Sequence, residues 1–401
     1  MTAARIRCAN DVKLSQTLLE NPEIKRVVAQ LERLEKKGER PTTRRQLLST
    51  SVRLSRAMAE PLHSMADHCV ERLGIETPLE LYAYASPQFN AACFKPEHGR
   101  VFIMFSSSLL EAFTNQELLF VMGHELGHHV YQHHDVPIGY VLRGRRPPPA
   151  DLALDLFAWS RYAEISADRA GAYCANDLDS VARALFKLAS GITRENVVTF
   201  RLDEFLGQVD EMLAFDDKPG QGAPMQDWFS THPFSPLRVK ALKFFHESSL
   251  MLDLGYEPPI LEDKVQQLMS LMEPDYMEGK NDASRAMRDL FLAAAVVIAD
   301  VYEGISDKER EVLKRFLGKA YAVDALDVGR LRDDLPRRIQ EARERASLTQ
   351  RMQVMRDICL IAATEEPVSD VEQGLLGEIA AGLEVSDSFV TQCLEASVEL
   401  D

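Results

Sequence analysis

The sequence predicts an α+β protein that is predominantly helical, with a small sheet in its N-terminal half and an all-α region at its C-terminal end. Two observations support this fold class. Apolar residues recur at helical spacing along most of the chain, and residues 99–105 form one short apolar run that suits a strand. With 401 residues, of which 46% are apolar, the chain can bury two cores, so two or three domains are expected.

The N-terminal part is expected to consist of a helical extension followed by a mixed domain. Residues 1–55 have the pattern of charged helical segments, with an apolar stripe that is broken near Pro41. We expect this extension to pack against the following domain or against a partner. Residues 56–250 are expected to form helices beside a small sheet, whose strand at 99–105 is bounded by Gly99 and contains no proline.

A long helix is predicted from Thr114 to Val130. Thr114 and Glu117 have the spacing of a capping box, and the apolar residues that follow keep helical spacing. Pro137 prevents much continuation of this helix. Any motif between these ends therefore lies in mid-helix, where its geometry is fixed.

The remainder of the mixed domain is also expected to be mostly helical. Residues 152–175 are rich in Leu, Ala and aromatic residues and contain few helix breakers, which predicts a second long helix. The Gly- and Pro-containing stretch 216–226 is a predicted loop. A further helix is expected to begin at Ser235 and Pro236, because proline is favoured in the first turn of a helix.

The C-terminal part is expected to be a linker, residues 251–282, followed by an all-α domain, residues 283–401. The apolar run Leu290–Ala299 fits a buried helix. Two S-D-x-E units, at 306–309 and 369–372, each follow an apolar run and form an imperfect internal repeat. Each unit has the form of a helix N-terminus in which Ser or Asp caps the helix and Glu reaches back.

The most informative motif is an H-E-x-x-H pattern inside the first long helix. Because positions i and i+4 share a helix face, His124 and His128 can bind one zinc ion while Glu125 stands beside the open coordination position. Glu164, on the second long helix, is the natural third ligand. Asp168 lies one turn further on and is expected to accept the second ring N–H of His124. The sequence therefore predicts one Zn²⁺ per chain.

These patterns resemble the gluzincin metallopeptidases typified by the heat-shock protease HtpX and the CAAX prenyl proteases. The resemblance rests on H-E-L-G-H followed by E-I-S-A-D, on Phe89-Asn90-Ala91 ahead of the apolar strand, and on Ser230-Thr231-His232-Pro233 followed by Arg238. It covers about residues 55–250 in the family's order and implies a zincin fold for residues 56–250. The sequence departs from most members in one respect, because those are embedded in membranes.

The C-terminal repeat is similar to that of tellurite-resistance TerB-like helical domains, which carry acidic helix starts after an apolar helix. In that family the acidic residues can hold metal. Here we favour capping over metal binding, because the S-D-x-E spacing is sufficient for a capping role. The resemblance implies an all-α TerB-like domain with a regulatory, targeting or assembly role, and self-association or a protein partner through this domain is left open.

The motif chemistry and the resemblance imply a zinc endopeptidase. Glu125 is expected to act as general base and then as general acid toward the leaving amine. His232 is the candidate that stabilises the oxyanion, although a loop histidine that caps nearby backbone is the alternative. Arg238 is expected to orient Asp168, Glu164 or the substrate terminus, or else to be a surface arginine.

The apolar strand suggests how a substrate binds. If Val101, Phe102 and Ile103 lie on the sheet edge beside the cleft, their backbone groups can pair with an extended polypeptide, and Asn90 can add a hydrogen bond. The alternative is an ordinary core strand that is buried on both faces. The expected partner is therefore a polypeptide substrate.

Composition excludes several other classes of partner. A net charge of −16 disfavours nucleic acid and anionic membrane surfaces, which would repel the chain. No apolar run approaches the ~20 residues that a membrane span needs. The six cysteines show no C-x-x-C spacing and no export signal is evident, so a cytoplasmic protein with reduced thiols is expected. His129, His133 and His134 are expected to be solvated residues at the helix end.

A second function of a different class is a catalytically silent zinc-binding scaffold, or a stress-response interaction protein that acts through its TerB-like domain. The intact Glu125 favours the enzyme, because a structural zinc site has no physical need for a base beside the metal. Metal content and cleavage of unfolded casein discriminate the two.

Overall fold

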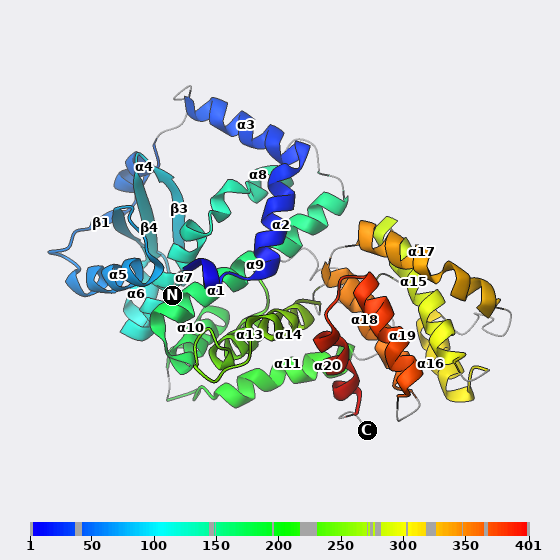
Figure 1. Ribbon diagram of the computed structural model, residues 1–401. Helices are drawn as coiled ribbons and strands as arrows, with labels where there is room; N and C mark the ends of the chain where they lie inside the picture. The colour runs from blue at the N-terminus through cyan, green and yellow to red at the C-terminus, as the bar shows by residue number, and fades with distance from the viewer. Residues whose placement is uncertain are drawn as a thin grey trace. The chain divides into compact units, whose positions relative to one another are not determined.

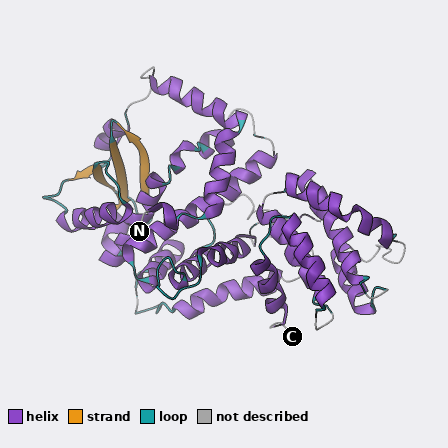
Figure 2. Ribbon diagram, viewed as in Figure 1, coloured by secondary structure: helices purple, strands orange, loops and turns teal. Residues whose placement is uncertain are grey.

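The computed structural model describes residues 3–36, 42–143, 148, 150–194, 196–216, 231–270, 272, 276, 282–301, 304–317, 326–346, 348–364 and 368–398. Its chain forms two compact units (Figure 1). The first comprises Met1–Val209 and Ser230–Pro258, and the second comprises Asp210–Phe229 and Pro259–Asp401. Figure 2 shows that helices predominate and that the strands gather in a single sheet. The α+β, mostly helical class is therefore confirmed at this coarse level.

Most described elements of the first unit are helices. They are α1 (Ala3–Ile6), α2 (Ala9–Glu20), α3 (Pro22–Lys36), α4 (Thr43–Thr50), α5 (Glu60–Leu73), α6 (Ser107–Ala112), α7 (Asn115–Val130), the 3₁₀ helix η1 (His133–Asp135), α8 (Ile138–Leu142), α9 (Ala150–Ala175), α10 (Leu178–Ser190) and α13 (Ser235–Glu247). Two more helices, α11 (Leu202–Asp216) and α14 (Pro258–Ser270), contain points at which the chain passes between the units.

The sheet has four strands in the order β1-β2-β4-β3. They are β1 (Val52–Leu54), β2 (Leu79–Tyr84), β3 (Ala91–Glu97) and β4 (Arg100–Ser106). β4 runs parallel to β2 and antiparallel to β3, while β1 pairs antiparallel with β2. The sheet edge next to β4 is therefore β3.

The expectation that residues 99–105 form the cleft-side edge is wrong. β4 has a paired neighbour on both sides, so its backbone groups are already used by β2 and β3. Val101, Phe102 and Ile103 are at most 1% exposed, which identifies a core strand. The apolar run that suggested a substrate-binding edge instead reflects burial on both faces of the sheet.

The predicted motif helix is confirmed as α7 (Asn115–Val130). Thr114 accepts a hydrogen bond from the Glu117 N–H, and the Glu117 carboxylate accepts one from the Thr114 N–H at 2.7 Å, which completes the capping box. Glu117 is buried and also forms an ion pair with Lys187, in which Oε2 lies 2.7 Å from the Lys187 Nζ. The helix ends when Gln132 adopts a left-handed conformation with φ 59°, ahead of Pro137.

The second predicted helix is confirmed as α9 (Ala150–Ala175), and it crosses α7 at very short range. A Cβ added at Gly171 would lie 2.5 Å from the backbone oxygen of Phe120, and one added at Gly127 would lie 2.9 Å from the Ala170 Cβ. Neither position can hold a larger residue without moving a helix. The small residues therefore let the two backbones approach closely enough for side chains from both helices to meet at one point.

The N-terminal helices belong to the same unit as α7 and α9. α2 packs on α9, and an apolar cluster joins Leu18 and Ile24 to Leu156 and Trp159 of α9. α2 also carries Asp11, whose carboxylate is fully buried. A buried charge on this helix requires polar partners in the surrounding protein.

All described elements of the second unit after α14 are helices. They are α15 (Asp282–Ala299), α16 (Asp307–Leu317), α17 (Val328–Arg345), α18 (Leu348–Ala362), α19 (Asp370–Gly382) and α20 (Asp387–Val398). The run Leu290–Ala299 is buried at the centre of this unit's core, as predicted. The likeness to a TerB-like domain stays a prediction.

Both S-D-x-E units cap helices, as predicted. The Ser306 N–H donates to Glu309 and the Glu309 N–H donates to the Ser306 hydroxyl, while Ser369 and Glu372 make the same reciprocal pair. These glutamates are thus engaged at the starts of α16 and α19.

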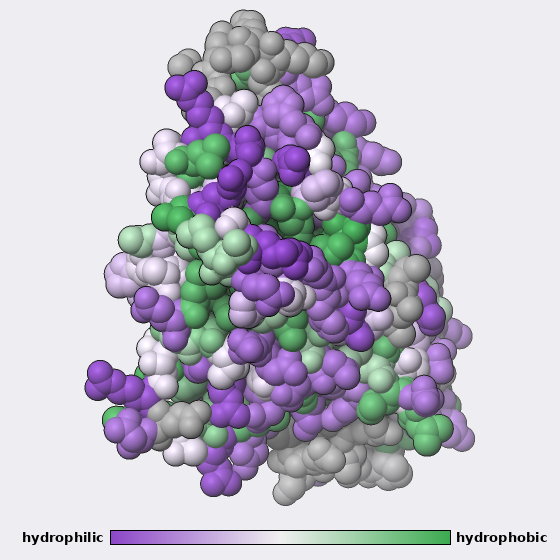
Figure 3. Space-filling view, turned by 90° about the vertical axis from the view of Figure 1, so that its left-hand side faces the viewer, coloured by the Kyte–Doolittle hydropathy of each residue, from purple (hydrophilic) through white to green (hydrophobic). Residues whose placement is uncertain are grey.

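The surface is mixed in character. Hydrophilic side chains are interspersed with smaller apolar areas on the face drawn in Figure 3. None of the helices in the described ranges is both long enough and apolar enough to cross a bilayer.

Candidate metal centre and active site

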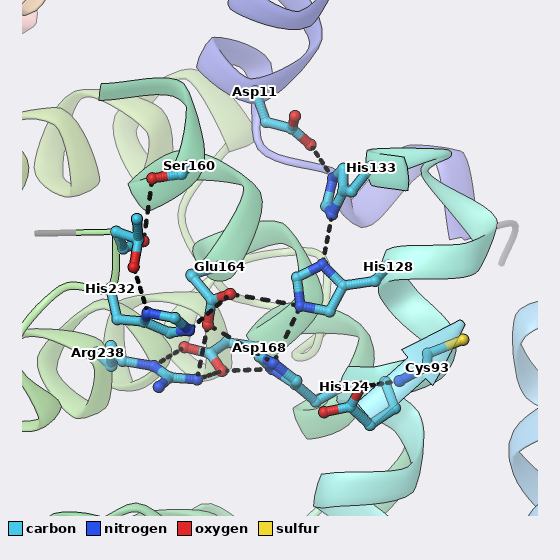
Figure 4. Close-up of polar contacts among 12 residues, drawn as sticks. Asp11, Cys93, His124, His128, His133, Ser160, Glu164, Asp168, His232 and Arg238 are labelled. Atoms are coloured by element: carbon cyan, nitrogen blue, oxygen red, sulfur yellow. Dashed lines mark hydrogen bonds and ion pairs between the residues drawn. The ribbon is translucent and has the colours of Figure 1, made fainter. Parts of the chain in front are cut away.

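Three side chains from two helices converge on one point (Figure 4). His124 and His128 come from α7 and Glu164 comes from α9, and one potential ligand atom from each lies within 4.8 Å of the others. The two Nε2 atoms are 3.2 Å apart, and each lies 3.4–3.6 Å from a Glu164 oxygen. Within the described part of the chain, this is the group of His, Cys, Asp and Glu side chains with the spacing of a metal site.

Asp168 and Arg238 support this group from behind. The Asp168 Oδ1 lies 2.9 Å from His124 Nδ1, so the ring N–H there donates to the carboxylate and Nε2 keeps its lone pair. Arg238, from α13, donates to both oxygens of Asp168 at 2.6–2.7 Å, and its Nη2 lies 3.4 Å from Glu164. This bidentate pair fixes the carboxylate that orients His124.

The electrostatics keep both buried carboxylates ionised. Burial raises the pKa of Glu164, but its hydrogen bond with His128 and the charges of His124, His128 and Arg238 outweigh this and hold the pKa well below its usual range. Burial likewise raises the pKa of Asp168, and Arg238 outweighs it. In the opposite direction, burial lowers the pKa of His128, while Glu164 outweighs this and raises it. The site therefore concentrates negative charge beside two imidazoles.

The donor set fits zinc. Glu164 Oε2 is buried and makes no hydrogen bond among the described residues, and its ion pairs with Arg238 Nη2 and His124 Nε2 are long at 3.4 and 3.6 Å, so this oxygen can still accept a closer ligand bond. Two imidazoles and one carboxylate are the ligand set of catalytic zinc sites, in which the fourth position stays open. The three ligand atoms already face one another. The residues present therefore suit a bound Zn²⁺.

Glu125 lies beside this group and against the edge strand. The Cys93 N–H, from β3, donates to Glu125 Oε2 at 2.7 Å. β3 is the outermost strand, so this N–H belongs to the unpaired edge of the sheet. Burial raises the pKa of the Cys93 thiol well above its usual range, so this small buried side chain stays neutral.

His232 approaches the group from a different segment. Its Nε2 lies 3.4 Å from Glu164 Oε1, and its Nδ1 lies 2.8 Å from the Thr231 hydroxyl. The Ser160 hydroxyl of α9 donates to the Thr231 carbonyl at 3.1 Å and holds this segment against the ligand helix. The side chain of His232 is 62% exposed. Ser230 and residues 217–226 of the predicted loop lie outside the described residues.

Three of the predicted substrate-binding residues are buried in the sheet, whereas the role of Asn90, which directly precedes β3, stays a prediction. Asn90 donates from its side-chain amide to the Tyr84 hydroxyl, and its backbone pairs with Ser106. Val101, Phe102 and Ile103 lie in the buried middle of the sheet. The strand that touches the motif glutamate is β3.

The expectation that His133 is solvated is wrong, and the role of Asp11 was missed. His133 is buried, with Nδ1 2.8 Å from His128 Nδ1 and Nε2 3.0 Å from Asp11 Oδ2. Asp11 lies 122 residues away in sequence, so no local pattern links the two. The only sequence signal was that Asp11, a charged residue, occupies an otherwise buried position of an amphipathic helix. Nothing in the sequence distinguishes it from the neighbouring charges, for which a solvated position is expected.

Replacing Arg238 with methionine is expected to destabilise the metal-free protein by about 3–5 kcal/mol, because the change leaves Asp168 buried without its counter-charge. Chemical denaturation in the presence of a chelator measures this. Lys243→Met on the same helix is the matched control, since Lys243 is exposed and its pair with Glu247 is long at 4.0 Å. A loss no larger than that of the control would contradict the support role of Arg238.

The same variant has a predictable pH dependence. The folded pKa of Asp168 is below its unfolded value, so the pair stabilises the fold above the unfolded pKa and this contribution is lost as pH falls through the folded value. Without Arg238, burial raises that pKa instead. The difference in unfolding free energy between wild type and Arg238→Met is therefore expected to be largest near neutral pH and to shrink below about pH 4.

Comparison with known proteins gives an independent result. The profile of the family described as peptidase family M48 matches residues 56–143 and 150–245. Plastoglobule-localized metallopeptidase 48, chloroplastic, of Arabidopsis thaliana is 34% identical across 36% of this chain and 44% of its own length. A protease HtpX homolog of Ralstonia nicotianae is 28% identical across 47% of this chain and 75% of its own length. The chain thus spans less than half the length of the first relative. No solved structure matches the chain significantly.

Proposed function

We propose that the chain is a member of peptidase family M48 and acts as a zinc-dependent endopeptidase of the gluzincin class that cleaves extended or unfolded polypeptide. The family profile's match to residues 56–143 and 150–245 and the likeness to two named peptidases support this proposal. One observation carries the proposal. His124, His128 and Glu164 converge within 4.8 Å while Glu125, which is not among the three, lies beside them with its carboxylate held by β3. This arrangement separates the ligands from the base, as hydrolysis requires.

His124, His128 and Glu164 would hold the ion. When bound, zinc supplies Lewis acidity that polarises the scissile carbonyl and makes water a nucleophile near neutral pH. Glu125 accepts one hydrogen bond from a described residue, the Cys93 N–H on Oε2. Its other oxygen can take the proton from the attacking water and deliver it to the leaving amine.

We assign oxyanion stabilisation to His232. Its imidazole lies beside Glu164 yet is mostly exposed, so it can reach a substrate at the open side of the group. The Thr231 hydroxyl contacts Nδ1 and orients the ring. A ring N–H directed at the substrate carbonyl would stabilise negative charge as it develops.

The edge strand β3 supports a polypeptide substrate. In an edge strand, the backbone groups that are not paired within the sheet belong to every second residue. The Cys93 N–H is one of these groups, and its hydrogen bond to Glu125 shows that this edge of β3 faces α7. An extended polypeptide that pairs with this edge would pass Glu125. Main-chain pairing of this kind selects extended conformation more strongly than particular side chains.

The second unit has its own core and carries none of the described site residues. We therefore propose a regulatory or assembly role for this helical unit rather than a catalytic one. Its TerB-like character remains part of this proposal.

Metal removal tests the peptidase proposal directly. Purified protein is expected to contain about one zinc per chain and to cleave unfolded casein. A chelator should abolish cleavage and added Zn²⁺ should restore it, with metal content measured on the same samples. Absence of zinc after metal loading would overturn the proposal. Bound zinc without cleavage of any unfolded substrate would instead support a catalytically silent scaffold.

A further inference from the structure

We propose that Asp11 and His133 are positioning residues for the metal ligand His128, so that the N-terminal helix α2 is an integral part of the metal centre. The inference rests on the proposed zinc chemistry and extends it to Asp11, which precedes residue 56 and so lies outside the segments matched by the peptidase family profile. Figure 4 shows Asp11, His133 and His128 in one continuous series of contacts.

The contacts form a chain of two hydrogen bonds. The Nδ1 atoms of His128 and His133 are 2.8 Å apart, and His133 Nε2 lies 3.0 Å from Asp11 Oδ2. His133 is 7% exposed and Asp11 is fully buried, so solvent does not compete for these groups. Hydrogen bonds in such surroundings are strong and directional.

The position of each proton follows from the donors and acceptors in this series of hydrogen bonds. Burial raises the pKa of Asp11, but hydrogen bonds from His133 and Arg7 outweigh this and lower it, so the carboxylate is ionised and accepts. His133 must therefore carry its hydrogen on Nε2, which leaves a lone pair on Nδ1. This lone pair accepts the hydrogen on His128 Nδ1.

The consequence is that His128 presents a lone pair at Nε2, the atom that faces His124 and Glu164. The other neutral tautomer of His128 would set two lone pairs against each other across 2.8 Å and place a hydrogen where a metal ion binds. Asp11 thus selects the metal-binding tautomer of a histidine that it does not touch.

Asp11 is itself held rigidly. Arg7 donates to both of its oxygens, and α9 contributes the Trp159 indole N–H at 3.1 Å and the Ser166 hydroxyl at 2.7 Å. Ser166 in turn accepts the Cys8 N–H at 3.1 Å. These bonds hold α2 against α9, the helix that carries Glu164. The contacts that orient His128 are therefore fixed relative to Glu164.

The arrangement mirrors the support of the other histidine. His124 is oriented by Asp168, which is paired with Arg238, and His128 is oriented through His133 by Asp11, which is paired with Arg7. Each ligand histidine is therefore connected by hydrogen bonds to a buried carboxylate, and each of these carboxylates is paired with a different arginine. Such outer partners set the tautomer and orientation of metal-ligating histidines.

Zinc affinity of full-length variants tests the inference. Asp11→Ala and His133→Phe each remove an acceptor from this series of hydrogen bonds and are expected to weaken zinc binding by about 10–100-fold, measured by competition with a chromophoric chelator. His133→Asn should recover much of this loss, because its side-chain oxygen can accept the hydrogen of His128 Nδ1. Absorption spectra of the Co²⁺-loaded proteins should shift for Asp11→Ala, since the geometry of His128 changes.

Leu18→Ala is the matched structural control. Leu18 packs α2 onto α9 and takes no part in the hydrogen bonds that join Asp11, His133 and His128. Its truncation should therefore lower the stability of the metal-free protein while leaving zinc affinity and the Co²⁺ spectrum unchanged. The inference is overturned if Asp11→Ala and His133→Phe bind zinc as tightly as wild type, or if Leu18→Ala weakens zinc binding as much as Asp11→Ala. Failure of wild type to bind zinc would instead overturn the proposed function on which the inference rests.

Discussion

Replacing Glu125 with glutamine is expected to lower kcat on unfolded casein by about 10²–10⁴-fold while zinc stoichiometry stays at the wild-type value. Glutamine cannot take a proton from water or return one to the leaving amine, so the chemical step loses its base and its acid. Glu125 is not one of the three convergent ligands, so the change should leave metal binding intact. Parallel measurement of kcat, KM and bound zinc checks both halves of the expectation.

The local fold should survive this substitution. The glutamine carbonyl oxygen can still accept the Cys93 N–H that Glu125 Oε2 accepts, so the contact between α7 and β3 is kept. Glu111→Gln, on the exposed side of α6, makes the same chemical change away from the metal centre and should leave kcat unaltered. A Glu125→Gln protein that retains wild-type kcat would show that another group acts as the base.

Local patterns account for what the sequence predicted correctly. The capping box at Thr114 and the 3.6-residue periodicity depend on residues within a few positions of one another, and the structure places α7 and α9 as expected. The meeting of the two helices was predicted only from the ligand pattern. Its physical basis, the close approach at Gly127 and Gly171, depends on packing between distant segments.

The position of a strand within a sheet could not be deduced in the same way. An apolar run such as 99–105 suits a central strand and an edge strand equally until its neighbours are known. The order β1-β2-β4-β3 makes the preceding strand, Ala91–Glu97, the edge. That strand contains Lys95 and Pro96, residue types that are common on sheet edges, and this was the signal that could have identified it.

Buried polar residues were the second source of error. His133 is surrounded by polar neighbours in sequence, which suggested a solvated helix end, but α2 covers it and supplies Asp11. The contact joins segments more than a hundred residues apart, and only the assembled fold brings them together. In contrast, the S-D-x-E units were assigned correctly because a capping box is a local structure.

Replacing His128 with alanine is expected to abolish stoichiometric zinc binding and all peptidase activity. Structural zinc in a four-ligand site is bound with about 10–16 kcal/mol, so one ligand accounts for roughly 3 kcal/mol or more and its loss weakens affinity by at least about 10²-fold. The change also removes the hydrogen that His133 accepts, which leaves a buried lone pair without its donor. Metal analysis after dialysis against a weak chelator, followed by the casein assay, measures the effect.

His129→Ala provides the comparison that isolates the role of the ligand. His129 is the next residue on α7, but successive residues are rotated by about 100° around the helix, so its ring lies on another face. Burial lowers the pKa of His129, so at neutral pH the substitution removes an uncharged imidazole next to the motif. The His129→Ala protein should retain its zinc and its activity. If the His128→Ala protein also retains one zinc per chain, the ion is held by other residues and the convergence of His124, His128 and Glu164 has a different cause.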